Sequence, residues 1–327
     1  MRRNFIRILL LILVMSTFMI GCSQNKTETE QKKEQTESKL KIYTTLFPIE
    51  DFAKKIGGSH VDVNSIIPLG TNAHTYEPTT KTMIGIAKGD AFIFSNKSME
   101  PYAVKIADAL KNENVKIVDA SKGIEMIAAG EESAGNHNES HGTETGHEEG
   151  HDHGDVDPHI WLDPILSVSI AKNITASLVE LKPEAAEEFE ANFNKLRLQL
   201  EELDGRFTEL VKGKTAPKIL VSHAGFGYWQ NRYGIKQISI TGLSSTNEPS
   251  QQGLQHIIDL AKENNIKYII FEQNITPKVA EIIKNEIHAE SLRIHNLSVL
   301  TEDDIKNNED YFSLMNKNIE TLKIALE

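Results

Sequence analysis

The sequence predicts an α/β protein whose two parallel-sheet lobes are joined by a single long rigid helix. Three features of the 327-residue chain support this prediction. Strand-like apolar segments alternate with helix-like segments in both halves, a pattern typical of parallel sheets covered by helices. A long amphipathic stretch separates the two halves. About 290 residues follow the polar N-terminal region, which is enough chain for two domains.

The first 21 residues have the order of charged and apolar residues that a secretion signal has. Three arginines precede the apolar stretch 8–20, and Gly21-Cys22 follows it. A membrane-spanning helix needs about 20 apolar residues, so this shorter stretch indicates a signal peptide that is removed. Cys22 is the only cysteine, which excludes an intrachain disulfide. The run Met19-Ile20-Gly21-Cys22 resembles a bacterial lipobox, which implies lipidation of Cys22; a signal peptide with an incidental cysteine is the alternative.

The polar residues 22–39 predict a lipidated flexible tether, because such a composition cannot bury a core. We therefore expect a lipid anchor on the outer face of the bacterial cytoplasmic membrane. The chain has a formal charge of -12, and removal of residues 1–21 would take away three arginines and make it more negative. Nucleic acid is therefore an improbable partner.

Residues 40–182 are expected to form the N-terminal lobe, and residues 214–327 the C-terminal lobe. Strands of the first lobe are expected at 40–44, 61–67 and 91–95, with a helix at 50–56 that Gly57-Gly58 ends. Strands of the second lobe are expected at 218–222, 236–240, 267–271 and 293–297. Strands that alternate with helices imply crossover connections, and therefore parallel sheets.

Residues 183–213 are predicted to form the helix that links the lobes. Apolar residues recur there at spacings of four and three, namely Phe189, Phe193, Leu196, Leu200, Leu203, Phe207 and Leu210. This period places one apolar stripe on a single helix, with Pro183 suited to its start and Gly213 to its end. At 1.5 Å per residue the helix would be about 45 Å long. A two-stranded coiled coil is the alternative interpretation of the stripe.

Residues 131–155 differ in composition from the rest of the chain. They contain eight acidic residues, five glycines and five of the 12 histidines: His137, His141, His147, His151 and His153. This composition predicts a flexible auxiliary metal-binding loop, and a solvated linker without metal is the alternative. The letters from His147 to His151 match a zinc-protease motif, but that motif requires a helix, which the glycines at 146, 150 and 154 disfavour.

Three further histidines occupy positions where strands or helices are expected to meet loops. His74 lies in a turn-rich stretch, His159 lies between two prolines, and His223 follows an apolar run. Ligands of open α/β sheets bind at the carboxyl ends of the strands, where His223 is expected. A single histidine in a loop is more often a surface residue than a metal ligand. The histidine-rich loop strengthens the interpretation of these three histidines as metal ligands. Imidazole suits zinc, whereas all-oxygen sites suit manganese, magnesium or calcium.

These motifs make the chain similar to the zinc and manganese solute-binding lipoproteins of ABC importers, also called the metal-binding adhesin family. The resemblance covers residues 40–327 and depends on the His74 turn and on residues 157–164, 222–228 and 248–250. The acidic histidine-rich loop resembles the zinc branch. The resemblance implies that His74, His159 and His223 hold Zn²⁺ as cargo in the cleft between the lobes. It also implies a monomer that delivers the ion to an ABC-transporter membrane permease.

The fourth ligand departs from the family pattern. Zinc-type relatives often place a glutamate in a Leu-x-Pro-Leu-Glu stretch, whereas this chain has Thr301 at the matching position. Glu302 is therefore the candidate fourth ligand, and water is the alternative. A metal-binding histidine usually donates its other N–H to a carboxylate or carbonyl, and Asp157 and Asp163 flank His159. Asp163 is better suited to cap a helix that begins near Pro164.

Three other functions stay open at the level of sequence. They are a binding protein for manganese or another divalent metal, a surface adhesin with a structural metal, and a zinc hydrolase. A catalytic zinc needs an open coordination position and a nearby base. Only Glu77 and Glu272 could supply such a base, and each is expected to be a surface or helix-cap carboxylate. The sequence therefore predicts a binding protein and not an enzyme.

Overall fold

The computed structural model describes residues 38–129, 156–246 and 248–327. Residues 39–327 form one compact unit, which contains a four-stranded sheet in each half of the chain. The predicted signal peptide, nearly all of the predicted tether and the predicted histidine-rich loop lie outside the described residues. In the part of the chain that is described, none of the helices has the length and apolar character of a membrane span.

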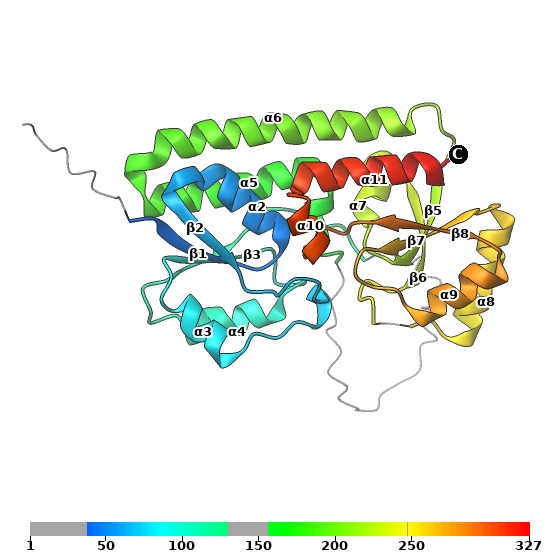
Figure 1. Ribbon diagram of the computed structural model, residues 1–327, viewed down its shortest axis with the longest axis horizontal. Coiled ribbons are helices and arrows are strands. Elements are labelled where there is room, and N and C mark those ends of the chain that lie inside the picture. The colour runs from blue at the N-terminus through cyan, green and yellow to red at the C-terminus, as the bar shows by residue number, and fades with distance from the viewer. Residues whose placement is uncertain (1–37, 130–155, 247) are drawn as a thin grey trace, which may run out of the picture. The chain divides into compact units, whose positions relative to one another are not determined.

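The N-terminal sheet has the strand order β2-β1-β3-β4, and all its strands are parallel. The strands are β1 (Leu40–Thr44), β2 (Val61–Ser65), β3 (Ala91–Phe94) and β4 (Lys116–Asp119). Two helices cover each face (Figure 1): α2 (Phe47–Gly57) and α5 (Pro164–Leu181) on one, α3 (Thr80–Ile86) and α4 (Pro101–Ala109) on the other. Of the four strands, the sequence prediction missed β4, a short strand with charged ends and little apolar signal.

The C-terminal sheet repeats this plan with the order β6-β5-β7-β8, again all parallel. Its strands are β5 (Lys218–His223), β6 (Lys236–Thr241), β7 (Tyr268–Glu272) and β8 (Glu290–Ile294). Side chains of β5 alternate between two cores: Ile219 and Val221 join the core of the N-terminal lobe, whereas Leu220 faces α8 (Gln251–Glu263) and α9 (Lys278–Glu286). One continuous core therefore extends from the first sheet to the second.

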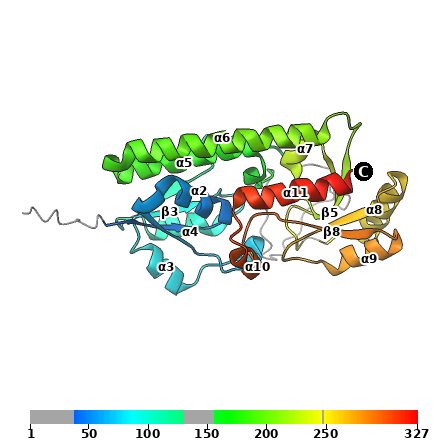
Figure 2. The ribbon, with the colours of Figure 1, turned by 45° about the horizontal axis from the view of Figure 1, so that its top comes forward.

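The predicted linking helix is confirmed. A 3₁₀ turn at Pro183–Ala185 leads into α6 (Ala186–Val211), which extends along both lobes (Figure 1). Six of the seven residues of its apolar stripe are buried, and Phe193 is half-buried. The stripe packs against α2, α5 and α11 (Tyr311–Ala325), and Figure 2 shows α5 beside α6. Helices of the same chain therefore occupy the surface that a coiled-coil partner would need.

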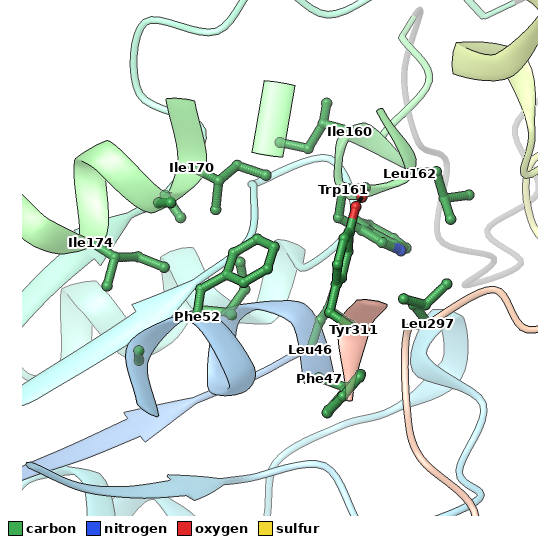
Figure 3. Packing of buried hydrophobic residues seen from close by; sticks show 14 of the residues in the cluster. Leu46, Phe47, Phe52, Ile160, Trp161, Leu162, Ile170, Ile174, Leu297 and Tyr311 are labelled. Atoms are coloured by element: carbon green, nitrogen blue, oxygen red, sulfur yellow. Dashed lines mark hydrogen bonds between the residues drawn. The ribbon is translucent and has the colours of Figure 1, made fainter. Parts of the chain in front are cut away.

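The chain returns to the N-terminal lobe after β8. The expected strand 293–297 is wrong, because β8 ends at Ile294 and Leu297 has a φ of +61°, which an extended strand cannot contain. The backbone N–H of Phe47 then donates to the carbonyl of Ser298 at 2.9 Å. Further along, α10 (Glu302–Lys306) precedes α11, whose Tyr311 packs near Phe52 and Trp161 (Figure 3). The last 30 residues thus tie the two lobes together a second time.

Candidate metal centre

Three short segments bring the predicted histidines together. His74 lies in a 3₁₀ turn (Ala73–Thr75), where the side-chain oxygen of Asn72 accepts the backbone N–H of His74 at 3.0 Å. His159 directly precedes a second 3₁₀ turn (Ile160–Leu162). His223 is the last residue of β5, as the sequence predicts. β5 lies between β6 and β7. The chain passes from β5 to β6 on one side and then crosses to β7 on the other, so His223 stands at a switch point of the sheet.

The three imidazole rings form a compact, buried cluster. The histidines are 5%, 1% and 1% exposed in chain order, and their ring centroids lie 5.2–5.4 Å apart. The Nε2 atom of His159 is 3.4 Å from Nε2 of His74 and 3.4 Å from Nε2 of His223. Two nitrogens bound to one tetrahedral zinc at about 2.05 Å would lie about 3.3 Å apart. The cluster therefore has the spacing of a metal site.

Carboxylates fix the protonation of two of these rings. Nδ1 of His159 lies 2.8 Å from Oδ1 of Asp157, and Nδ1 of His223 is hydrogen-bonded to Oε1 of Glu272. Because a carboxylate only accepts, each Nδ1 carries a proton, and in the neutral ring each Nε2 then presents its lone pair. Two lone pairs at 3.4 Å repel each other unless a cation lies between them. The donor set is therefore prepared for a metal ion.

Glu272 lies at the end of β7 and is 1% exposed, so the expectation of a surface or helix-cap carboxylate is wrong. Its second oxygen accepts a hydrogen bond from the side-chain amide of Asn296. Burial alone would raise the pKa of Glu272, but the electrostatic interaction and the hydrogen bond with the adjacent His223 ring outweigh burial and hold the pKa below its ordinary value. Both carboxylate oxygens are thus engaged. Glu77, the other candidate base, is exposed as expected.

The two aspartates that flank His159 have the separate roles that the sequence suggests. Asp157 is 2% exposed, and its Oδ1 accepts both the ring Nδ1–H and the backbone N–H of His159. Asp163 caps α5 by accepting the backbone N–H groups of Ile165 and Leu166 at 2.8 and 3.1 Å. Its other oxygen accepts from the side chain of Arg232 in the C-terminal lobe at 2.6 Å. Asp157 therefore orients the ring of His159, while Asp163 holds the segment that follows it.

The C-terminal edge of the N-terminal sheet supports the backbone of the His159 segment. The side-chain amide of Asn96 donates to the carbonyl of Pro158 at 2.9 Å. The turn that carries Asn96 is held by Glu100, whose Oε2 accepts the backbone N–H groups of Ser95 and Asn96. Complete burial raises the pKa of Glu100 to about 7. The end of β3 and the proposed ligand are thus joined by one hydrogen-bonded path.

Gly225 and Gly227 have no side chains, and this leaves space for the ring of His223 and the carboxylate of Asp157. A Cβ atom on Gly225 would lie 2.5 Å from Cε1 and 2.7 Å from Nε2 of His223. A Cβ atom on Gly227 would overlap Oδ2 of Asp157. Contacts below 3.0 Å require the ring, the carboxylate or the backbone to move. The motif 222–228 therefore contains both His223 and the two glycines that leave room for its ring and for the carboxylate of Asp157.

Comparison with known proteins places this chain in a family. A family model described as "Zinc-uptake complex component A periplasmic" (ZnuA) matches residues 42–325. This chain belongs to the ZnuA family. Zinc-binding lipoprotein AdcA of Streptococcus pneumoniae is 34% identical over 315 residues, which are 96% of this chain and 60% of AdcA. High-affinity zinc uptake system protein ZnuA of Bacillus subtilis is 31% identical over 316 residues, which are 97% of each chain.

Solved structures of ZnuA-family relatives have the same fold. Zn(II)-bound AdcA from Streptococcus pneumoniae aligns with a TM-score of 0.73 at 31% identity, over 88% of this chain and 58% of that one. The laminin-binding protein Lmb of Streptococcus agalactiae, described as a bifunctional protein with adhesin and metal transporting activity, aligns with a TM-score of 0.76 at 26% identity, over 89% of this chain and 100% of Lmb. The chain thus spans about 60% of AdcA but nearly all of Bacillus subtilis ZnuA.

Within this ZnuA-family fold, the structure brings together three of the four predicted metal ligands. One ligand atom from each of His74, His159 and His223 lies within 4.8 Å of the others. Glu302 is not part of this group, because it is the exposed first residue of α10. Thr301 caps the same helix, and its hydroxyl donates to Asp304 at 2.6 Å. The remaining predicted site residues, Cys22 and the five histidines of the 131–155 loop, lie outside the described residues.

Proposed function

We propose that this chain is an extracytoplasmic zinc-binding protein that captures Zn²⁺ and delivers it to the membrane permease of an ABC-type importer. The convergence of three buried Nε2 atoms at zinc-like spacing carries this proposal. The names of the relatives agree with it, since AdcA is a zinc-binding lipoprotein and Bacillus subtilis ZnuA belongs to a zinc uptake system. Binding without catalysis is the expected role, because Glu272 has both oxygens engaged and is not free to act as a base.

The proposed ligands are His74, His159 and His223, with water at the fourth position. A set of three nitrogens favours zinc over manganese, which prefers oxygen ligands. Glu302 is the weaker candidate for the fourth position because it is exposed on α10, and the hydroxyl of Thr301 already bonds Asp304. A tetrahedral site with three protein ligands then takes its last ligand from solvent.

A metal titration of the purified chain tests the proposed function. Metal is first removed, and zinc and manganese are then titrated separately by calorimetry, with ester and peptide substrates assayed in parallel. We expect one tight zinc per chain, much weaker manganese binding and no turnover. Manganese binding as tight as zinc binding would contradict the zinc assignment. Metal-dependent hydrolysis would contradict the transport role.

Residues 137–153 are proposed to gather zinc beside this site. The described flanks of the histidine-rich segment meet at an antiparallel bridge between Ala128 and Val156. The next residue, Asp157, donates its backbone N–H to the carbonyl of Ile127 at 2.9 Å and orients His159. The described residues that flank the segment are therefore held together beside the aspartate that orients His159. Zinc held by His137, His141, His147, His151 and His153 would raise the local zinc concentration at the cluster.

Deleting residues 136–154 should remove weak zinc binding and leave the tight site intact. A glycine-rich segment of this composition should lose conformational entropy of about 1–2 kcal/mol for each backbone residue that binding fixes, so its affinity should be the lower of the two. Titration of the variant should show one tight zinc and fewer weak ones, and cells that carry it should grow less well when zinc is scarce. An unchanged stoichiometry would mean that the segment is only a linker. Loss of the tight site would reverse the two assignments.

The anchor is proposed to be a lipid on Cys22, which would hold the protein on the outer face of the cytoplasmic membrane. The lipobox-like residues 19–22 and the polar residues that follow support this proposal. The name of AdcA, a lipoprotein, agrees with it.

Cys22→Ala should therefore release the protein from membranes or leave it unprocessed at residue 22. Each buried methylene of a lipid contributes about 0.8 kcal/mol to membrane binding, so loss of the lipid should be evident in fractionation. Cell fractionation and mass spectrometry of the N-terminus provide the readout. A normal membrane fraction with a normally processed N-terminus would contradict the anchor.

A further inference from the structure

One short segment forms hydrogen bonds near all three histidines. This segment, residues 296–300, is called the strap, and it connects β8 to α10. Its first residue, Asn296, donates a side-chain hydrogen bond to Oε2 of Glu272, whose Oε1 holds Nδ1 of His223. The orientation of His223 therefore depends on a carboxylate that Asn296 and His223 share.

The strap also reaches the segments that carry His159 and His74. The indole N–H of Trp161 donates to the carbonyl of Asn296 at 2.8 Å, and the Trp161 ring packs edge-on against His159 with centroids 5.3 Å apart. At the other end of the strap, the backbone N–H of Gly70 donates to the carbonyl of Leu300 at 2.8 Å. Gly70 lies in the connection between β2 and the turn that carries His74. The strap is thus bonded to Glu272 beside His223, to Trp161 beside His159, and to the connection that precedes His74.

Asn296 holds the strap in an unusual backbone conformation. Its Oδ1 accepts the backbone N–H of Ser298 at 2.9 Å and the Ser298 hydroxyl at 2.7 Å, which closes a tight turn around Leu297. Leu297 has a φ of +61°, a left-handed conformation that is unfavourable for a leucine, and its side chain is fully buried. Figure 3 shows this side chain near Trp161 and Tyr311. A strained conformation of this kind persists only where surrounding contacts determine it.

We infer that Asn296 is a positioning residue for the whole metal centre and that the strap sets the geometry of the three histidines relative to one another. This inference rests on the proposed zinc site. The strap joins Glu272, Trp161 and Gly70, which come from separate segments of both lobes. Removing the Asn296 amide takes one donor from the buried Glu272 and the acceptor from the Ser298 turn. The carboxylate of Glu272, which holds Nδ1 of His223, is then free to rotate. The turn at Leu297, which keeps the strap bonded to Trp161 and Gly70, is loosened.

Asn296→Ala tests this role, with Asn173→Ala as the matched control. Asn173 donates two side-chain hydrogen bonds at 2.9 Å, to the carbonyls of Ala120 and Lys122, and contacts none of the three histidines through them. Zinc affinity is measured by competition titration of folded protein. The visible spectrum of the Co²⁺-loaded protein reports the geometry around the metal. We expect Asn296→Ala to weaken zinc binding by about 10-fold to 100-fold and to change the Co²⁺ bands, while Asn173→Ala changes neither.

The results distinguish a failure of this inference from a failure of the proposed function. Unchanged zinc affinity and an unchanged Co²⁺ spectrum in Asn296→Ala would overturn the inference, and so would an equal loss in Asn173→Ala. A wild-type chain that binds no zinc would instead refute the proposed function. If Asn296→Ala does not fold, Gln273→Ala replaces it, because Gln273 bonds both the backbone N–H and Oδ1 of Asn296 at 3.0 Å. The same changes, smaller in size, are then expected, and their absence would overturn the inference.

Discussion

Replacing His159 by alanine is expected to weaken zinc binding by well over tenfold, which is the largest effect that any single substitution should have. His159 is the central member of the cluster, since its Nε2 lies 3.4 Å from the Nε2 atoms of both His74 and His223. Loss of a group outside the ligand set typically costs 10-fold to 100-fold in metal affinity, so loss of a ligand should cost more. His74→Ala and His223→Ala should act in the same direction. Competition titration of each variant gives the measurement.

An exposed histidine provides the control for this series. His256 lies on the exposed side of α8, so His256→Ala should leave the tight site unchanged. Metal ligation requires neutral imidazole, and zinc affinity of the wild-type chain should therefore fall as the solution is made acid. Tight binding that survives all three ligand substitutions would place the zinc elsewhere in the chain.

The three clustered histidines could be singled out because each lies where a strand or helix is expected to meet a loop, and the family resemblance then implied that they bind the metal together. His223 ends an apolar run, and the carboxyl end of such a strand is where α/β sheets bind ligands. Glu272 ends the apolar segment of β7 in the same way, but the sequence prediction left it on the surface. Its importance depends on the strand order, because only the pairing of β5 with β7 brings Glu272 to His223, 49 residues away. The order of the strands in a sheet cannot be read from the local pattern of the sequence.

The region after β8 shows a different limit of sequence reasoning. The apolar residues there favour a strand through Leu297, and the neighbouring position suggests Glu302 as a ligand. The left-handed backbone of Leu297 ends any extended structure, and a leucine carries no local signal for such a conformation. Hydrogen bonds from the backbone N–H and the hydroxyl of Ser298 to Oδ1 of Asn296 close this turn. The capping box between Thr301 and Asp304 then starts α10 with Glu302 in an exposed position.

The spacing of glycines in the motif 222–228 is likewise explained only by the structure. In sequence, Ala224-Gly225 indicates that β5 ends and a turn begins. In the fold, Gly225 lies against Cε1 and Nε2 of the His223 ring, and Gly227 lies against the carboxylate of Asp157. The glycines therefore belong to the proposed metal centre, although neither has a side chain that could bind an ion.

Gly225→Ala is accordingly expected to weaken zinc binding by about 10-fold to 100-fold, an effect comparable to loss of an orienting residue. The new Cβ atom would lie 2.5 Å from Cε1 and 2.7 Å from Nε2 of His223. The ring cannot easily move away, because His223 is 1% exposed and is held by Glu272. Either the ring rotates off the position at which it binds the metal, or the backbone after β5 shifts. Zinc titration and the Co²⁺ spectrum of the variant should both change.

Gly205→Ala is the matched control for this substitution. Gly205 lies within α6, its φ is not positive, and a Cβ atom there would meet nothing within 4 Å. Alanine at this position should raise the free energy of unfolding by about 0.5–1 kcal/mol, because glycine is unfavourable inside a helix. Its zinc affinity should equal that of the wild-type chain. Equal zinc affinities in Gly225→Ala and Gly205→Ala would show that the ring of His223 does not need the space beside Gly225, and the proposed placement of the metal at its Nε2 would have to be abandoned.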